Sequence, residues 1–176
     1  MARQLRIHVS CRDDRGLLAT VAQCLYELDG ALGDATFALL GEQAELTCVC
    51  AVPDGLDEGV LRQALRDLPG LADGEITVRP FRLGHSHAQS GRATHIVRVS
   101  GQDRPGLVAQ LAEGFSELGA NVVRFDSDQD EARKGAEYWM RFEVWIPKGR
   151  EDVVLAHCAN TAEAIGLSFW SGVAST

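Results

Sequence analysis

The sequence has no long apolar run, no excess of basic residues and few aromatic side chains. No uninterrupted apolar stretch approaches the ~20 residues that cross a bilayer, so we expect no transmembrane helix. The formal net charge is −8, from 17 basic and 25 acidic residues, which argues against direct binding to nucleic acid or anionic lipid. The amino terminus has no apolar segment typical of a secretory signal, and the location we expect is cytoplasmic.

Signatures of metal and catalytic sites are also missing. The odd number of cysteines and their scattered positions favour small buried thiols in a reducing compartment over disulfides or metal ligands; they are Cys11, Cys24, Cys48, Cys50 and Cys158. There is no Gly-x-Ser-x-Gly elbow, no His-Glu-x-x-His pair and no phosphate-binding loop. We therefore expect no enzyme activity, no metal and no other cofactor.

The apolar residues that are present repeat in two clear periods. In the first half, alternation predicts strands at 5–11, 34–40, 46–52 and 76–81, and helical spacing predicts helices at 17–28 and 60–68. This order, strand-helix-strand-strand-helix-strand, is typical of an α+β, ferredoxin-like βαββαβ fold. It predicts a four-stranded antiparallel sheet with both helices on one face, which leaves the other face open.

A polar stretch at 85–93 separates this pattern from a second copy of it. His85 and His87 lie in this stretch and are either a metal pair or part of a solvated loop; we favour the loop. The pattern then restarts, with strands predicted at 95–100, 122–126, 138–146 and 167–170 and helices at 106–118 and 154–165. A charged loop is predicted at 127–135 and a short tail at 171–176. The predicted organisation is therefore one domain at 1–84, a linker at 85–93 and a second domain at 94–176.

The two halves share a turn between their first strand and first helix. With a shift of 90 residues, Asp13 aligns with Asp103, Gly16 with Gly106 and Leu17 with Leu107, an Asp-x-x-Gly-Leu pattern that indicates an internal duplication. Backbone N–H groups are unpaired at a helix start and attract small anions such as a carboxylate. Asp103 is either part of such a site or a helix N-cap, and one residue can serve both roles.

The residues of this turn and the segments after it resemble the ACT domain, a small amino-acid-sensing module. The matching segments are Asp103-Arg104-Pro105-Gly106-Leu107, the helix that follows to Leu118, and Gly119-Ala120-Asn121-Val122. The first half departs from the pattern, with Arg15 at the position of Pro105 and Ala31 at that of Asn121. A chain of two such modules and little else is similar to the glycine cleavage system transcriptional repressor type of regulator.

The resemblance implies ligand-dependent regulation without catalysis. ACT domains pair side by side and bind an amino acid at the seam, so a homo-oligomer and a small ligand, such as glycine or serine, are expected. The implied ligand-binding residues are Asp103, Arg104, Pro105, Gly106, Leu107 and Asn121, together with Asp13, Asp14, Gly16 and Leu17 by repeat alignment. Action through a partner protein, in transcriptional control of amino-acid metabolism, is the expected output.

An oligomerisation or interaction module without a ligand is the alternative function. Trp139 and Trp145 lie on one face of a strand whose other face carries Tyr138, Met140 and Phe142. A strand with large residues on both faces is either buried twice or part of an interface. The sequence leaves open which amino acid binds, and whether the modules pair within the chain or across a dimer.

Overall fold

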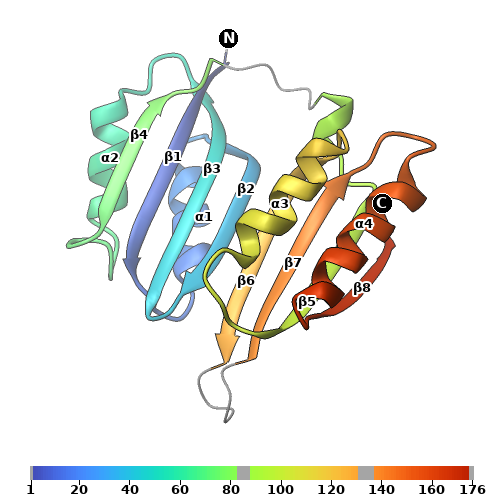
Figure 1. Cartoon of the computed structure of the whole chain (residues 1–176). Helices are drawn as coiled ribbons and strands as arrows, with labels where there is room; N and C mark the ends of the chain where they lie inside the picture. Colours follow the sequence, from blue (N-terminus) through green and yellow to red (C-terminus); the bar gives the residue numbers. More distant parts are fainter. Residues whose placement is uncertain (1, 83–87, 131–136, 175–176) are drawn as a thin grey trace. The chain divides into compact units, whose positions relative to one another are not determined.

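The two predicted repeats fold as two units, residues 1–83 and 84–176. The computed structural model describes residues 2–82, 88–130 and 137–174. Each unit has the predicted order of strands and helices, and its helices lie on one face of its sheet (Figure 1). The ferredoxin-like α+β fold predicted for both halves is therefore confirmed.

The first unit is a four-stranded antiparallel sheet in the order β2-β3-β1-β4. Alternating apolar residues of its central strands are buried, among them Leu5, Ile7 and Val9. The buried stripe of its first helix consists of Leu17, Val21, Cys24 and Leu25, at the spacing that puts them on one helix face. Its elements are β1 (Ala2–Arg12), α1 (Leu17–Glu27), β2 (Ala31–Leu40), β3 (Gln43–Pro53), α2 (Glu58–Arg66) and β4 (Glu75–Pro80).

The second unit repeats this topology, with strand order β6-β7-β5-β8. Its core is more aromatic: the ring of Phe142 packs against Phe115 at 5.4 Å and Phe125 at 4.8 Å between centroids. Its elements are the 3₁₀ turn η1 (Gln89–Gly91), β5 (His95–Gln102), α3 (Leu107–Glu117), β6 (Asn121–Asp130), β7 (Glu137–Trp145), α4 (Glu151–Ala164) and β8 (Ser168–Val173).

Three strands at sheet edges are longer than predicted. β2 begins at Ala31 rather than 34, β6 runs on to Asp130 through part of the predicted charged loop, and β8 continues to Val173 through part of the predicted tail. These segments have no apolar alternation of their own, but they hydrogen-bond to an adjacent strand; Asp130 pairs with Glu137, for example. Of the predicted loop and linker, residues 131–135 and 85–87, the latter including His85 and His87, lie outside the described residues.

Candidate functional site

The turns before α1 and α3 have the same backbone conformation. Gly16 (φ 83°) and Gly106 (φ 91°) are both left-handed and occupy the N-cap positions of the two helices. Gly106 is the N-cap residue of α3, and the described side chains give neither helix a hydrogen bond at its cap, so the alternative role of Asp103 as a helix N-cap is wrong. Apart from the adjacent residues of the chain, no described atom lies within 4 Å of the position that a Cβ would take on either glycine, so the helix starts are open on that side.

Asp103 is held by a residue that the sequence analysis did not identify. Gln129 Nε2 donates a hydrogen bond to Asp103 Oδ2 at 3.2 Å. Gln129 lies near the end of β6, in the stretch predicted to be a loop, and only the extended strand brings it next to the turn. The amide fixes one carboxylate oxygen, and the other stays available as an acceptor.

Arg104 connects the turn to the C-terminal end of α4. Its guanidinium donates to the backbone oxygen of Ile165, the C-cap residue of that helix. A cation at a helix C-terminus is stabilised by the unpaired carbonyl groups there. In this conformation Arg104 therefore fixes the position of the turn.

A hollow of about 440 Å³ opens beside the second turn. The side chain of Leu107 is buried in the core, so only its backbone faces the hollow. Tyr138, at the start of β7, adds a half-buried ring to the lining. The sequence pattern, in which Tyr138 alternates with Met140, predicted only a core position for it. The lining residues are Asp103, Arg104, Pro105, Gly106, Leu107, Val108, Ala109 and Tyr138.

Asn121 lies at the far end of the same sheet. It begins β6, whereas Asp103 lies beside the end of β6, and a strand of ten residues spans about 30 Å. Its Nδ2 donates to the backbone oxygen of Ser90 at 2.8 Å. One unit by itself therefore brings together residues 103–107 but not Asn121.

The first turn uses more of its polar groups internally. Asp14 Oδ1 accepts from the N–H of Arg15 at 2.7 Å, and Leu17 N–H donates to the Asp14 carbonyl at 3.3 Å. The N–H of Asp13 donates to the carbonyl of Glu42 at 2.9 Å. Asp13, Asp14, Gly16 and Leu17 thus lie together, as the repeat requires, but the turn offers fewer groups to a ligand than the second one does.

The cysteines are free and buried, as predicted. Burial raises the pKa of Cys48 and of Cys158 to about 11, so both are neutral thiols at physiological pH. In the described part of the chain, no three histidine, cysteine or acidic residues come close enough to hold a metal ion. Among these residues, no helix is long and apolar enough to span a membrane.

Comparisons with known proteins identify the second unit. Residues 95–156 match the ACT domain family. Among solved structures, an unknown protein from Galdieria sulphuraria has a TM-score of 0.75 at 16% identity, covering 99% of this chain and 100% of its own. A candidate glycine cleavage system transcriptional repressor has a TM-score of 0.66 at 12% identity, covering 100% and 99%. Among curated proteins, none matches this chain significantly.

Proposed function

We propose that this chain is a non-catalytic regulatory protein that binds a small amino acid, because residues 95–156 match the ACT domain family and the first unit has the same strand order. The single observation that carries the proposal is the turn at 103–107. There, a tethered carboxylate, an open glycine and the start of a helix meet at one hollow. Glycine and serine are the candidate ligands.

These groups match the two charges of a zwitterion. The backbone N–H groups of Gly106 and Leu107 are donors for an α-carboxylate, and the positive end of α3 favours the same charge. Asp103, oriented by Gln129, is an acceptor for an α-ammonium group. Both charges of an amino acid therefore find complementary partners in a turn of five residues.

We propose that a neighbouring edge strand completes the site. β6 is at the edge of its sheet, so its outer backbone groups can pair with another strand. In an antiparallel pair, the start of one strand meets the end of the other. If two copies of β6 pair around Phe125, Asn121 of one copy comes next to Gln129 of the other and so close to Asp103. A homo-oligomer follows from this arrangement.

The absence of catalysis is part of the proposal. His8, Thr47 and Glu45 form a cluster in the first unit that resembles a catalytic triad. His8 Nδ1 lies 3.0 Å from Thr47 Oγ1, and its Nε2 lies 3.5 Å from Glu45 Oε2. A hydroxyl nucleophile also needs backbone donors for the developing oxyanion. β1 and β3 are each paired on both sides, so their backbone donors are used in the sheet. The cluster is better explained as a cross-strand polar network.

The output we propose is contact with a partner protein in the cytoplasm, in transcriptional control of amino-acid metabolism. The fold shared with a candidate repressor supports this choice, and the net charge of −8 favours a protein target over DNA. Salt-sensitive binding of DNA by the pure chain in a gel shift would contradict this part of the proposal.

A thermal-shift screen against the twenty amino acids tests ligand binding. A ligand at about one hundred times its Kd stabilises the folded state by ~2.7 kcal/mol, which raises Tm by several degrees. We expect a selective rise for one small amino acid, lost in Asp103→Ala and reduced in Asn121→Ala. Asp13→Ala, the matched change in the first turn, should retain the response of the second.

The alternative function, an interaction module without a ligand, makes the opposite prediction. It requires a flat screen together with self-association that sedimentation detects, and neither property should respond to Asp103→Ala. A flat screen would overturn the amino-acid proposal.

A further inference from the structure

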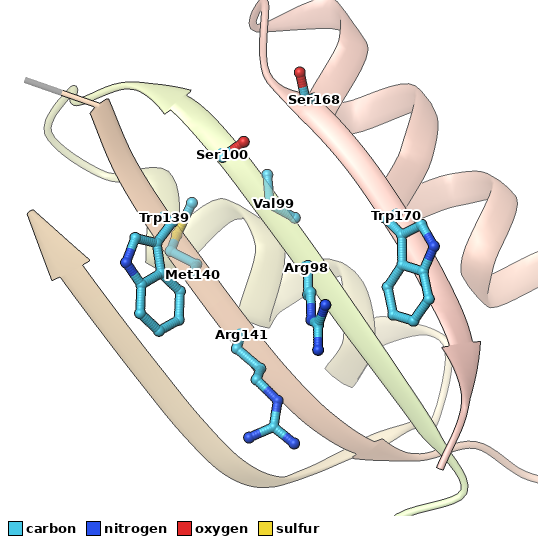
Figure 2. Close-up of a pocket in the computed structure, with 8 residues that line it drawn as sticks. All are labelled: Arg98, Val99, Ser100, Trp139, Met140, Arg141, Ser168 and Trp170. Carbon is cyan, nitrogen blue, oxygen red and sulfur yellow. The ribbon is translucent and has the colours of Figure 1, made fainter. Parts of the chain in front are cut away.

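The helix-free face of the second sheet has a hollow of about 430 Å³ that is separate from the turn at 103–107. Figure 2 shows the side chains around it, with Trp139 and Trp170 on either side of the central strand β5. The lining residues are Arg98, Val99, Ser100, Trp139, Met140, Arg141, Ser168 and Trp170. Val99 and Met140 are buried in the core, so the other six supply the groups that face a ligand.

Strand register sets these six side chains in two rows. Ser100 pairs with Trp139 on one side and Ser168 on the other. Two residues away on the same face, Arg98 pairs with Arg141 and with Trp170. Trp139 and Arg98 are therefore diagonal neighbours, roughly 7–8 Å apart at the backbone. An aromatic ring with a short acidic side chain spans such a distance.

The two arginines differ in how their charge is balanced. The guanidinium of Arg141 lies 2.7 Å from a Glu143 oxygen and 3.7 Å from an Asp126 oxygen. Arg98 instead lies over the ring of Trp170, 5.0 Å from its centroid, and no described carboxylate lies within ion-pair distance of it. A cation–π contact orients Arg98 without neutralising it, so its donors remain available to an anion.

None of the eight residues that line the hollow is acidic, in a chain of net charge −8, and Arg98 supplies a positive charge there. Its rings are also accessible, with Trp139 41% and Trp170 51% exposed. Exposed indole faces beside a guanidinium that pairs with none of the described carboxylates fit a ligand that carries both a π-face and a negative charge. An ammonium group finds no carboxylate partner among the lining residues.

The first unit has the same strand positions but different chemistry. There, Ser10 pairs with Glu45 and Glu75, and His8 pairs with Thr47 and Thr77. Glu45 therefore stands at the position of Trp139, and Thr77 at that of Trp170. Glu45 accepts a hydrogen bond from Ser10 at 2.7 Å. The fold therefore does not require tryptophan here, and the pair of tryptophans is specific to the second copy, whereas the hollow on the same face of the first sheet is lined by Arg6, His8, Thr47, Thr77 and Arg79.

We infer that this hollow is a second ligand site, one that takes a small aromatic carboxylate. The ring stacks on Trp139, the carboxylate accepts hydrogen bonds from Arg98, and the hydroxyl groups of Ser100 and Ser168 contact the atoms between them. Because the lining lacks an acidic group, the site prefers an aryl carboxylate to the zwitterionic amino acid proposed for the turn. The two sites are chemically distinct, and neither depends on the other.

Titration of the full chain with phenylacetate tests the inference, with calorimetry and tryptophan fluorescence as readouts. Phenethylamine, with the same ring and a positive charge, and cyclohexylacetate, with the charge but no π-face, are the matched controls. We expect phenylacetate to bind, both controls to bind more weakly, and added salt to weaken binding. Arg98→Gln and Trp139→Leu should each raise Kd about tenfold or more.

Two control variants locate the ligand. Trp145→Phe changes a tryptophan on the same strand face outside the lining, and Asp103→Ala changes the proposed amino-acid site; both should leave the phenylacetate Kd unchanged. Equal affinity for phenethylamine, or a Kd unaffected by Arg98→Gln, would overturn the inference. Loss of binding in Asp103→Ala would move the ligand to the turn. Absence of binding, with self-association that Trp139→Leu abolishes, would make the face an interface between copies instead.

Discussion

At the scale of single residues, Gly16 and Gly106 hold the two turns in their shape. Both lie in the left-handed region, which costs a residue with a Cβ roughly 1–2 kcal/mol. The space around both is open, so backbone conformation rather than crowding requires glycine. The glycine of the repeated Asp-x-x-Gly-Leu pattern therefore has a conformational cause that is independent of any ligand.

Gly106→Ala should lower the free energy of unfolding of the second unit by about 1–2 kcal/mol, because alanine is strained at this φ. Urea unfolding measures the change. Gly55→Ala is the control, since Gly55 is also in open space but has no positive φ. A destabilisation of equal size in both variants would contradict this explanation.

The buried thiols make stability depend on pH in alkaline solution. Their ordinary pKa of 9.0 is raised to about 11 for Cys48 and Cys158 in the fold. The folded state therefore holds these protons more tightly than the unfolded state, and their contribution is fully present below pH 9. It is lost as the pH rises from about 9 to about 11.

The urea concentration at the midpoint of unfolding should accordingly decrease as the pH rises from 9 to 11. A Cys48→Ala, Cys158→Ala double variant should start from a lower stability, because it removes buried atoms, but should show a smaller fall over this range. The comparison isolates the thiols from tyrosine and lysine, which titrate in both proteins. Equal pH slopes for the two proteins would contradict the prediction.

At the scale of elements, the edge strands differ from the central ones. Central strands bury one face completely, so the alternation of apolar and polar residues predicts them; β3, with Leu46, Cys48 and Cys50, is an example. β2 is largely exposed along its length and contains an irregular register between Leu32 and Ala35. Strands of this kind form because an adjacent strand offers backbone partners, so their ends cannot be found from side-chain pattern alone.

This difference has consequences for both proposed sites. The extension of β6 to Asp130 puts Gln129 beside Asp103, and the pairing of β8 with β5 puts Trp170 beside Arg98. The first contact links the predicted charged loop to Asp103, a predicted ligand-binding residue. The second links two predicted strands through residues for which the sequence predicted no role. Edge strands therefore decide which residues meet in this fold.

At the scale of the whole molecule, each unit has its own hydrophobic core, and the two cores share no residue. Leu61 belongs to the first core and Phe115 to the second, and both are at most 1% exposed. Destabilisation of one core should therefore act first on its own unit.

Leu61→Ala should cost about 2–5 kcal/mol of the stability of the first unit, because it leaves a cavity beneath the sheet. Native-state hydrogen exchange should then quicken for the amides of β1 and β3, while those of β5 and β7 keep their protection. Phe115→Ala is the matched variant and should give the reverse pattern. Equal loss of protection in both units would contradict separate cores.

The sequence by itself determined the duplication, the order of strands and helices, the buried faces and the Asp-x-x-Gly-Leu pattern that the two turns share. These follow from short-range periodicity and backbone preference, which side chains a few residues apart encode. The tertiary structure alone decided that Gln129 holds Asp103, that Arg104 binds the end of α4, that Asn121 lies about 30 Å from the turn, and that Arg98 stacks on Trp170. These pairings depend on strand register between segments distant in sequence, and no local pattern specifies a register.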